Sequence, residues 1–203
     1  MTKHVFSFLA FGDSYTIGEA VPLHESFPYQ AIQLLRMASF HFHAPEIIAK
    51  TGWTTGELAE HILHTKLNEH YDFVTLLIGV NNQYRELSIE DYSTDFEFLL
   101  RKAIHFAADK KDNVVVLSIP DWGVTPFAKK RDSKKIAAEI DAYNKINKAT
   151  AERYKVKYID ITPNTRAAKD NASLIAGDGL HPSGKAYTEW AKMLASLLQK
   201  GLK

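Results

Sequence analysis

The sequence predicts an α/β protein in which helices cover both faces of a five-stranded parallel sheet. Three short runs are almost wholly apolar and rich in branched side chains. Strands have this composition when helices bury both of their faces. Helical patterns lie between the runs, and strands alternating with helices form right-handed crossovers in a three-layer α/β/α fold. The runs are residues 5–11, 73–78 and 114–119.

Two weaker runs complete the predicted sheet. Residues 47–49 and 156–161 are short and apolar, and each stands between two helical patterns. With them, the chain supplies five strands.

Five segments carry the three- and four-residue spacing of apolar side chains that is typical of helices. The clearest patterns cover 92–107 and 187–198, and weaker ones cover 28–40, 55–68 and 133–154. We expect Ser133 to cap the last of these weaker helices. We expect Pro182 to stand in the first turn of the C-terminal helix, where its missing N–H costs nothing.

Length and composition indicate a globular protein. The chain has 203 residues, of which 45% are hydrophobic and 24% are charged, and we expect a single domain over residues 1–203. The net charge of +1 predicts neither a nucleic-acid partner nor a charged membrane partner. Because there is no cysteine, disulfides and thiolate chemistry are excluded.

The N-terminal segment predicts a first strand rather than an export signal. Its apolar run passes straight into Gly12-Asp13-Ser14, without a small-residue cleavage site. No run approaches the roughly 18 apolar residues of a membrane span. We therefore expect a cytoplasmic protein without membrane insertion. The sequence does not indicate an oligomeric state.

Glycines and polar residues follow every predicted strand. In open α/β sheets, the loops after the strands carry the functional residues, because parallel strands end at the same edge. These segments are Gly12-Asp13-Ser14, Thr51-Gly52-Trp53, Gly79-Val80-Asn81-Asn82, Pro120-Asp121-Trp122-Gly123 and Asp178-Gly179-Leu180-His181.

Ser14, His181 and Asp178 have complementary roles in nucleophilic catalysis. A serine hydroxyl needs a base, and His181 can take its proton. Asp178 stands three positions before His181 and can meet Nδ1, which leaves Nε2 to face Ser14. The backbone N–H groups of Ser14 and Gly52 and the side-chain amide of Asn81 are candidate donors for an oxyanion hole.

These residues resemble the SGNH hydrolases, also called the GDSL esterase/lipase family, which are named for Ser, Gly, Asn and His in separate blocks. The matching blocks span residues 11–182 and are Gly12-Asp13-Ser14-Tyr15, Gly52, Gly79-Val80-Asn81 and Asp178-x-x-His181. The resemblance implies a flavodoxin-like fold and a serine esterase that needs no metal or cofactor. It also implies the same roles for the triad and the three oxyanion donors.

Two positions depart from the family's common pattern. Tyr15 stands where many members have leucine, and Asn82 stands where the third block often has aspartate. Asn82 can still hydrogen-bond, but it carries no charge.

Other readings fit the sequence less well. An α/β-hydrolase places its serine in Gly-x-Ser-x-Gly, and here Thr16 takes the place of the last glycine. A dinucleotide-binding fold needs a glycine fingerprint that this chain lacks. The pairs His41/His43 and His61/His64 have no evident third partner, so we predict no metal site. A binding module that kept the fold without catalysis is the main non-enzymatic alternative.

We therefore predict an esterase that acts on small-molecule carboxylic esters, with short acyl groups such as acetyl preferred because no long apolar lid is evident. A lysophospholipase, a thioesterase and an acyltransferase that use the same triad stay open. Trp53, Tyr84 and Trp122 are candidates to line the substrate pocket. Arg85 could meet an anionic substrate, although a surface salt bridge is its expected role.

Overall fold

The computed structural model describes residues 4–202 and contains the predicted parallel sheet. Its strands are β1 (Phe8–Asp13), β2 (Glu46–Lys50), β3 (Phe73–Leu77), β4 (Val114–Leu117) and β5 (Lys157–Ile159). They lie side by side in the order β2-β1-β3-β4-β5, and every neighbouring pair is parallel. The predicted fold class is confirmed.

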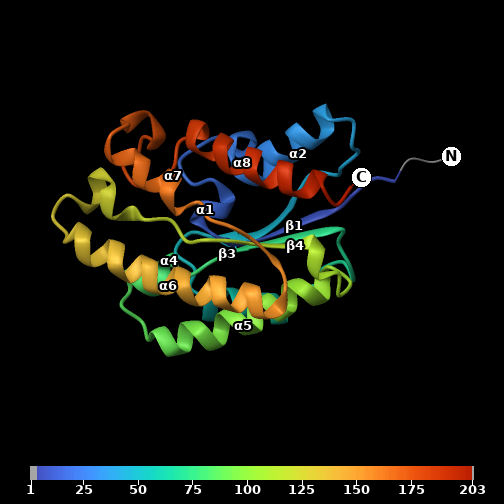
Figure 1. Cartoon of the computed structure of the whole chain (residues 1–203), viewed down its shortest axis with the longest axis horizontal. Coiled ribbons are helices and arrows are strands. Elements are labelled where there is room, and N and C mark those ends of the chain that lie inside the picture. The colour runs from blue at the N-terminus through green and yellow to red at the C-terminus, as the bar shows by residue number, and fades with distance from the viewer. Residues whose placement is uncertain (1–3, 203) are drawn as a thin grey trace.

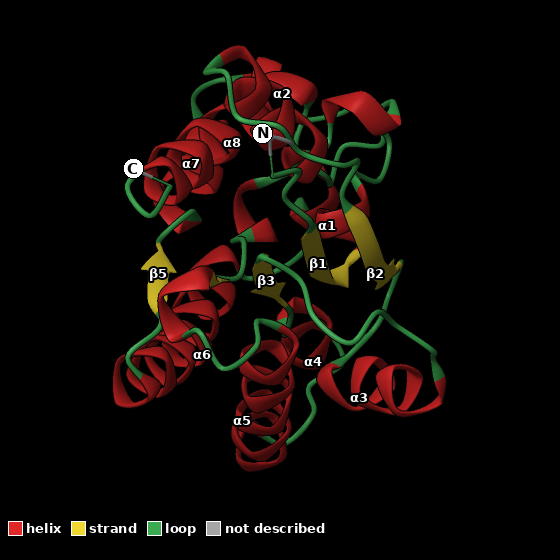
Figure 2. Cartoon of the chain, turned by 90° about the vertical axis from the view of Figure 1, so that its right-hand side faces the viewer, coloured by secondary structure: helices red, strands yellow, loops and turns green. Residues whose placement is uncertain are grey.

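Helices cover both faces of this sheet. Figures 1 and 2 show α1, α2, α7 and α8 on one face and α3, α4, α5 and α6 on the other. Their bounds are α1 (Ser14–Ile17), α2 (Phe27–Met37), α3 (Thr55–His64), α4 (Val80–Tyr84), α5 (Ile89–Phe106), α6 (Ser133–Tyr154), α7 (Thr162–Arg166) and α8 (Gly184–Gln199). Short 3₁₀ turns lie in the connections.

Burial differs between the central and the edge strands. Every residue of β1, β3 and β4 is buried, whereas β2 and most of β5 are half-buried or exposed. An edge strand has one neighbour instead of two, so fewer of its side chains are enclosed. This difference explains why the two edge strands have the weakest apolar runs in the sequence.

Two expected helix starts are wrong by one or two residues. Asp132, not Ser133, caps α6, because its carboxylate accepts hydrogen bonds from the Lys134 and Lys135 amides. Pro182 lies outside α8, which begins at Gly184 and is capped by Ser183. In both cases an adjacent side-chain oxygen satisfies the first free amides of the helix.

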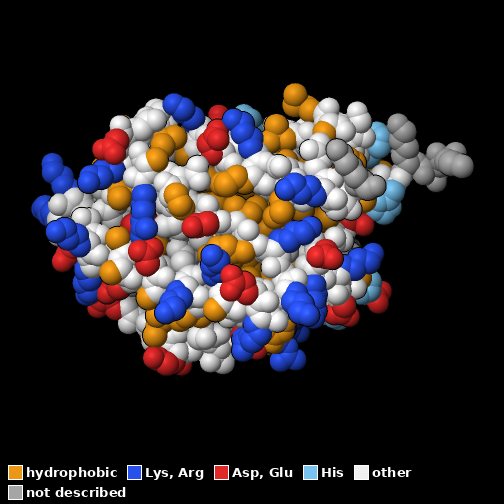
Figure 3. All heavy atoms as spheres, in the orientation of Figure 1, with side chains coloured by type: hydrophobic (Ala, Val, Ile, Leu, Met, Phe, Trp, Pro, Cys, Tyr) orange, Lys and Arg blue, Asp and Glu red, His pale blue; other side chains and the backbone are white. Residues whose placement is uncertain are grey.

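The surface carries charges of both signs. On the face drawn in Figure 3, Lys and Arg side chains are interspersed with Asp and Glu. Within residues 4–202, no helix is long and apolar enough to cross a membrane.

Candidate active site

Ser14 lies where β1 passes directly into α1. The strand ends at Asp13, which caps the helix by accepting a 3.0 Å hydrogen bond from the Tyr15 amide. As the first residue of α1, Ser14 has a backbone N–H without an acceptor inside that helix. The Ser14 side chain is therefore fixed at the C-terminal edge of the sheet by a central strand, with only 4% of the residue exposed.

His181 reaches Ser14 from the other end of the chain. Its Nε2 lies 2.9 Å from the Ser14 hydroxyl oxygen, and its Nδ1 lies 2.5 Å from Asp178 Oδ2. The other oxygen of Asp178 accepts 3.0 Å hydrogen bonds from the Leu180 and His181 amides. The structure thus brings the three predicted catalytic side chains into one hydrogen-bonded chain.

The contacts of Asp178 within this triad favour its ionised form. Partial burial acts to raise the pKa of Asp178, but the hydrogen bonds from the His181 ring and from the Leu180 and His181 amides hold it below its usual range. A carboxylate that stays ionised can orient the imidazole and stabilise its protonated form.

Tyr15 packs against the imidazole. The two rings are 4.9 Å apart, and Tyr15 is buried. Burial, followed by the nearby Asp13 and Asp178 carboxylates, raises the pKa of Tyr15 above its usual range, so the phenol stays neutral. The departure from leucine at this position therefore places an aromatic wall beside His181.

Gly52 occupies a tight turn after β2. The Trp53 amide donates to the Lys50 carbonyl at 3.2 Å, and Gly52, the third residue of this turn, has φ = +82°. Glycine adopts this conformation without the strain that a Cβ would cause. Since Lys50 pairs with Asp13 in the sheet, the turn lies next to the start of α1.

Asn81 lies on the other side of β1, in α4. Gly79 precedes this helix with φ = +129°, and a Cβ there would come within 2.4 Å of the Tyr92 ring. The Asn81 side-chain amide donates to the Trp53 carbonyl at 3.0 Å. Because β1 lies between β2 and β3, this bond connects the loops that flank the Ser14 strand.

The second proton on the Asn81 amide nitrogen is not needed for the bond to Trp53, since a primary amide carries two N–H donors. The predicted oxyanion donors thus come from the ends of three adjacent strands. Their role in binding an oxyanion stays a prediction.

Asn82 holds α4 against α3. It is buried, its Oδ1 accepts from the Thr55 amide at 3.0 Å, and its Nδ2 donates to the Thr55 hydroxyl at 2.8 Å. That hydroxyl gives its own proton to Asp95 at 3.0 Å. An amide at position 82 therefore supplies a proton that an ionised aspartate could not supply.

The three candidate pocket residues differ in accessibility. Tyr84 is 43% exposed, whereas Trp122 is 5% exposed and donates its indole N–H to Gln83 at 2.7 Å. Trp53 is half-buried and packs on His61 with 4.7 Å between the rings. Of the three, Tyr84 has the most surface available for a substrate.

Phe127 was not named among the candidate pocket residues, although the segment 120–131 that contains it was the candidate specificity loop. It is 48% exposed, and its ring lies 6.0–6.1 Å from those of Trp122 and Tyr84. Its amide donates to the Gly179 carbonyl, so it lies beside the loop that holds Asp178 and His181. Phe127 lies between two prolines and a basic cluster in an irregular segment, where no periodic pattern identifies it.

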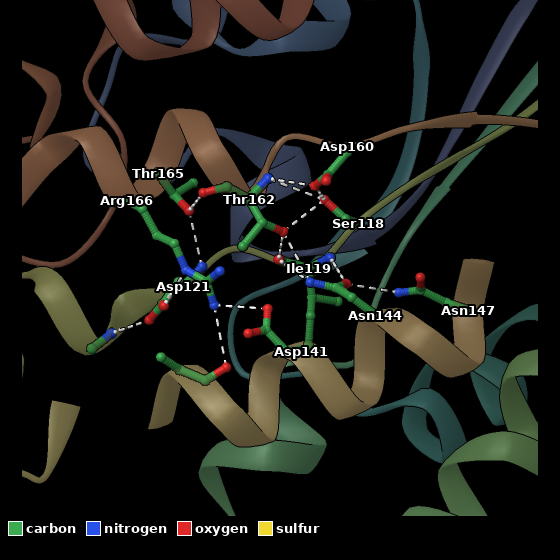
Figure 4. Close-up of polar contacts among 12 residues, drawn as sticks. Ser118, Ile119, Asp121, Asp141, Asn144, Asn147, Asp160, Thr162, Thr165 and Arg166 are labelled. Atoms are coloured by element: carbon green, nitrogen blue, oxygen red, sulfur yellow. Dashed lines mark hydrogen bonds and ion pairs between the residues drawn. The ribbon is translucent and has the colours of Figure 1, made fainter. Parts of the chain in front are cut away.

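The loop after β4 is fixed by an ion pair between a buried carboxylate and a partly exposed arginine. Asp121 contacts Arg166 Nε of α7 at 2.8 Å and accepts from the Gly123 amide, while its own amide donates to Thr165 (Figure 4). Arg166 also contacts Asp141 of α6 at 2.8 Å. A buried carboxylate needs such partners, and they connect this loop to both helical layers.

Within residues 4–202, the histidine pairs His41/His43 and His61/His64 are not part of a set of metal ligands. In the part of the chain that the structure describes, no three His, Cys, Asp or Glu side chains gather in a way that could hold a metal ion.

The fold is that of the SGNH hydrolases. Residues 10–188 match the model of the GDSL-like lipase/acylhydrolase family. The chain belongs to this family, and it is a carboxylic ester hydrolase. No curated protein sequence gives a significant match.

Solved structures of similar fold cover nearly the whole chain. TesA has 16% identity and a TM-score of 0.71, covering 97% of this chain and 98% of its own. The esterase EstA from Pseudoalteromonas sp., inhibited by monoethylphosphonate, has 15% identity, a TM-score of 0.71, and the same coverages. The acetylxylan esterase Axe2 from Geobacillus stearothermophilus has 17% identity and a TM-score of 0.70, covering 98% and 94%. At these identities the likeness shows the fold.

Asp13 gives the site a pH-dependent stability. It is fully buried and its Oδ2 has no partner among the described residues, so burial raises its pKa from 3.8 to about 7 despite the hydrogen bond from the Tyr15 amide. Between these pH values the folded state holds a proton that the unfolded state has lost. The free energy of unfolding contributed by Asp13 therefore falls as the pH rises through this window.

We expect Asp13→Asn, which keeps an oxygen for the Tyr15 amide, to remove this contribution. Relative to wild type, the variant gains more in melting temperature at about pH 8 than at about pH 5. Thermal denaturation of both proteins at the two pH values checks this. An equal difference in melting temperature between the two proteins at both pH values would contradict the raised pKa of Asp13.

The substitution Asn82→Asp tests whether the hydrogen bond that Asn82 donates to the Thr55 hydroxyl stabilises the fold. We expect the variant to lose about 1–3 kcal/mol of unfolding free energy at neutral pH, because a buried carboxylate would face Asp95 across one hydroxyl. Urea denaturation measures this loss, and Asn171→Asp on the exposed surface is the matched control. Equal stability of Asn82→Asp and wild type would show that the amide is not required.

Proposed function

We propose that this protein hydrolyses small carboxylic esters through an acyl-enzyme on Ser14. The observation that carries the proposal is the continuous chain from the Ser14 hydroxyl through His181 to Asp178, with distances of 2.9 and 2.5 Å. These are hydrogen-bonding distances between a nucleophile, a base and an orienting acid.

The proposed reaction has two halves. His181 Nε2 takes the Ser14 proton as Oγ attacks the ester carbonyl, and the tetrahedral intermediate collapses when His181 protonates the leaving alcohol. Water then attacks the acyl-enzyme in the same way and releases the acid. Asp178 holds the imidazole through Nδ1 and stabilises its positive charge in both halves.

The negative charge on the carbonyl oxygen needs donors at the C-terminal edge of the sheet. We assign this role to the backbone N–H groups of Ser14 and Gly52 and to the second N–H of the Asn81 amide. Donors held in place before reaction stabilise the transition state most effectively, because no reorganisation is needed when charge develops.

The proposed preference for short acyl groups rests on the small space beside His181. A cavity of about 20 Å³ lies beside this residue, with Tyr15, Leu174 and Leu180 among its walls. This volume holds about one water molecule, and Ser14, Gly52 and Asn81 do not line the cavity, so it offers no deep apolar pocket to an acyl chain on Ser14. The exposed rings of Tyr84 and Phe127 offer an apolar rim for the remainder of the substrate.

A phosphonate probe tests the nucleophile. We expect a fluorophosphonate to label wild-type protein at one site and not to label Ser14→Ala, and Ser14→Ala to lose at least about 10³-fold in kcat on p-nitrophenyl acetate. Ser133→Ala, an exposed serine at the start of α6, is the matched control and should be labelled like wild type. Labelling that persists in Ser14→Ala would refute the proposal, and a wild-type protein that neither labels nor hydrolyses esters would indicate a binding module.

A series of p-nitrophenyl esters tests the acyl preference. We expect kcat/KM to be highest for acetyl or propionyl and to fall as the acyl chain lengthens, because the cavity beside His181 is small. Steady-state rates across chain lengths measure this. A maximum at long chains would instead favour a lysophospholipase or a long-chain thioesterase, and product transfer to an added alcohol would favour an acyltransferase.

A further inference from the structure

One face of α4 and the residue that ends it hold the backbone of the turn after β2. Arg85 is one helical turn beyond Asn81, and its amide donates to the Asn81 carbonyl at 3.0 Å. Residues spaced by four share a face of a helix. On this face Asn81 binds the Trp53 carbonyl, and the adjacent Asn82 accepts from the Thr55 amide.

Arg85 binds another backbone carbonyl of the turn, that of Gly52. Its Nη2 donates to this oxygen at 2.6 Å, and its Nη1 lies 3.3 Å from Glu57 Oε1. A hydrogen bond from a charged guanidinium is stronger than one from a neutral donor, and the planar group can bind two acceptors in a fixed geometry. The contact with Glu57 is the surface salt bridge expected from the sequence. The contact with Gly52 was not foreseen.

Gly52 is the residue of this turn that most needs an external restraint. With φ = +82° and no Cβ, its backbone can rotate into several other conformations at little steric cost. In the proposed function the Gly52 N–H serves the oxyanion at Ser14, and rotation about Gly52 would turn this donor away. The Gly52 carbonyl belongs to the peptide unit that follows Gly52, so the bond from Arg85 holds this unit in place and opposes rotation about the backbone of Gly52.

We infer that Arg85 is a positioning residue for ester hydrolysis, which keeps the Gly52 N–H directed at the oxyanion by holding the Gly52 carbonyl. This inference rests on the proposed function. Arg85 itself is not assigned a contact with the substrate. Its loss should therefore reduce transition-state stabilisation and leave ground-state binding of a neutral ester nearly unchanged.

The test uses Arg85→Met with p-nitrophenyl acetate, a neutral ester. We expect kcat to fall about 10-fold, less than the roughly 10²–10³-fold that follows complete loss of an oxyanion donor, with KM within about 2-fold of wild type. Phosphonylation of Ser14 should slow by a similar factor. The melting temperature should change by less than about 3 °C, because the Arg85 ion pair is exposed.

Two controls separate positioning from other roles. Glu57→Gln removes the ion pair and keeps an oxygen for the Thr54 amide, so kcat should stay within about 2-fold of wild type. Arg153→Met breaks the exposed pair with Glu97 on the α5–α6 surface and should have no effect on kcat. If kcat fell as much in Glu57→Gln as in Arg85→Met, the inference would be overturned, since loss of the ion pair alone would then explain the lower kcat.

The outcomes also separate this inference from the proposed function. A wild-type protein without Ser14-dependent hydrolysis contradicts the proposed function, whereas an active wild type with undiminished kcat in Arg85→Met contradicts only the role of Arg85. A loss confined to KM for anionic esters would overturn it in favour of a substrate-binding arginine. Should Arg85→Met fold poorly, Arg85→Gln keeps a polar side chain that is too short to reach the Gly52 carbonyl, and wild-type kcat in that variant would equally overturn the inference.

Discussion

The whole site depends on the parallel arrangement of the strands. Because neighbouring strands run in the same direction, the loops after β1, β2 and β3 emerge at one edge of the sheet. The loop before α8 reaches the same edge, and a single hydrogen bond between His181 and Ser14 joins residues 167 positions apart. An antiparallel neighbour to β1 would place its following loop at the opposite edge and disperse the site.

The site is held by polar contacts that come at a cost in stability. Asp13 is buried beside the nucleophile, and within residues 4–202 one of its oxygens has no partner, although its other oxygen caps α1. When the buried Asp13 carboxyl ionises, it stabilises the folded state less. Its hydrogen bond to the Tyr15 amide nevertheless fixes the strand-to-helix turn that presents Ser14. Functional sites commonly break a local rule of stability in this way.

The sequence was sufficient for the sheet and for the residues brought together at its edge, because buried strands and glycine-rich loops leave clear local patterns. The short helices α1, α4 and α7 were not predicted, since four or five residues are too few to show a helical period. Phe127 and the Arg85 contact with Gly52 depend on how distant loops pack, which no local pattern records. The single domain, the cytoplasmic location and the need for no cofactor stay predictions.

A crystal structure of the protein phosphonylated on Ser14 tests the central claim most directly, because a tetrahedral phosphonate resembles the intermediate of ester hydrolysis. The account predicts that one phosphonyl oxygen lies about 2.7–3.1 Å from the Ser14 amide, the Gly52 amide and Asn81 Nδ2. A phosphonyl oxygen that points into solvent, with Gly52 and Asn81 more than about 4 Å away, would contradict it.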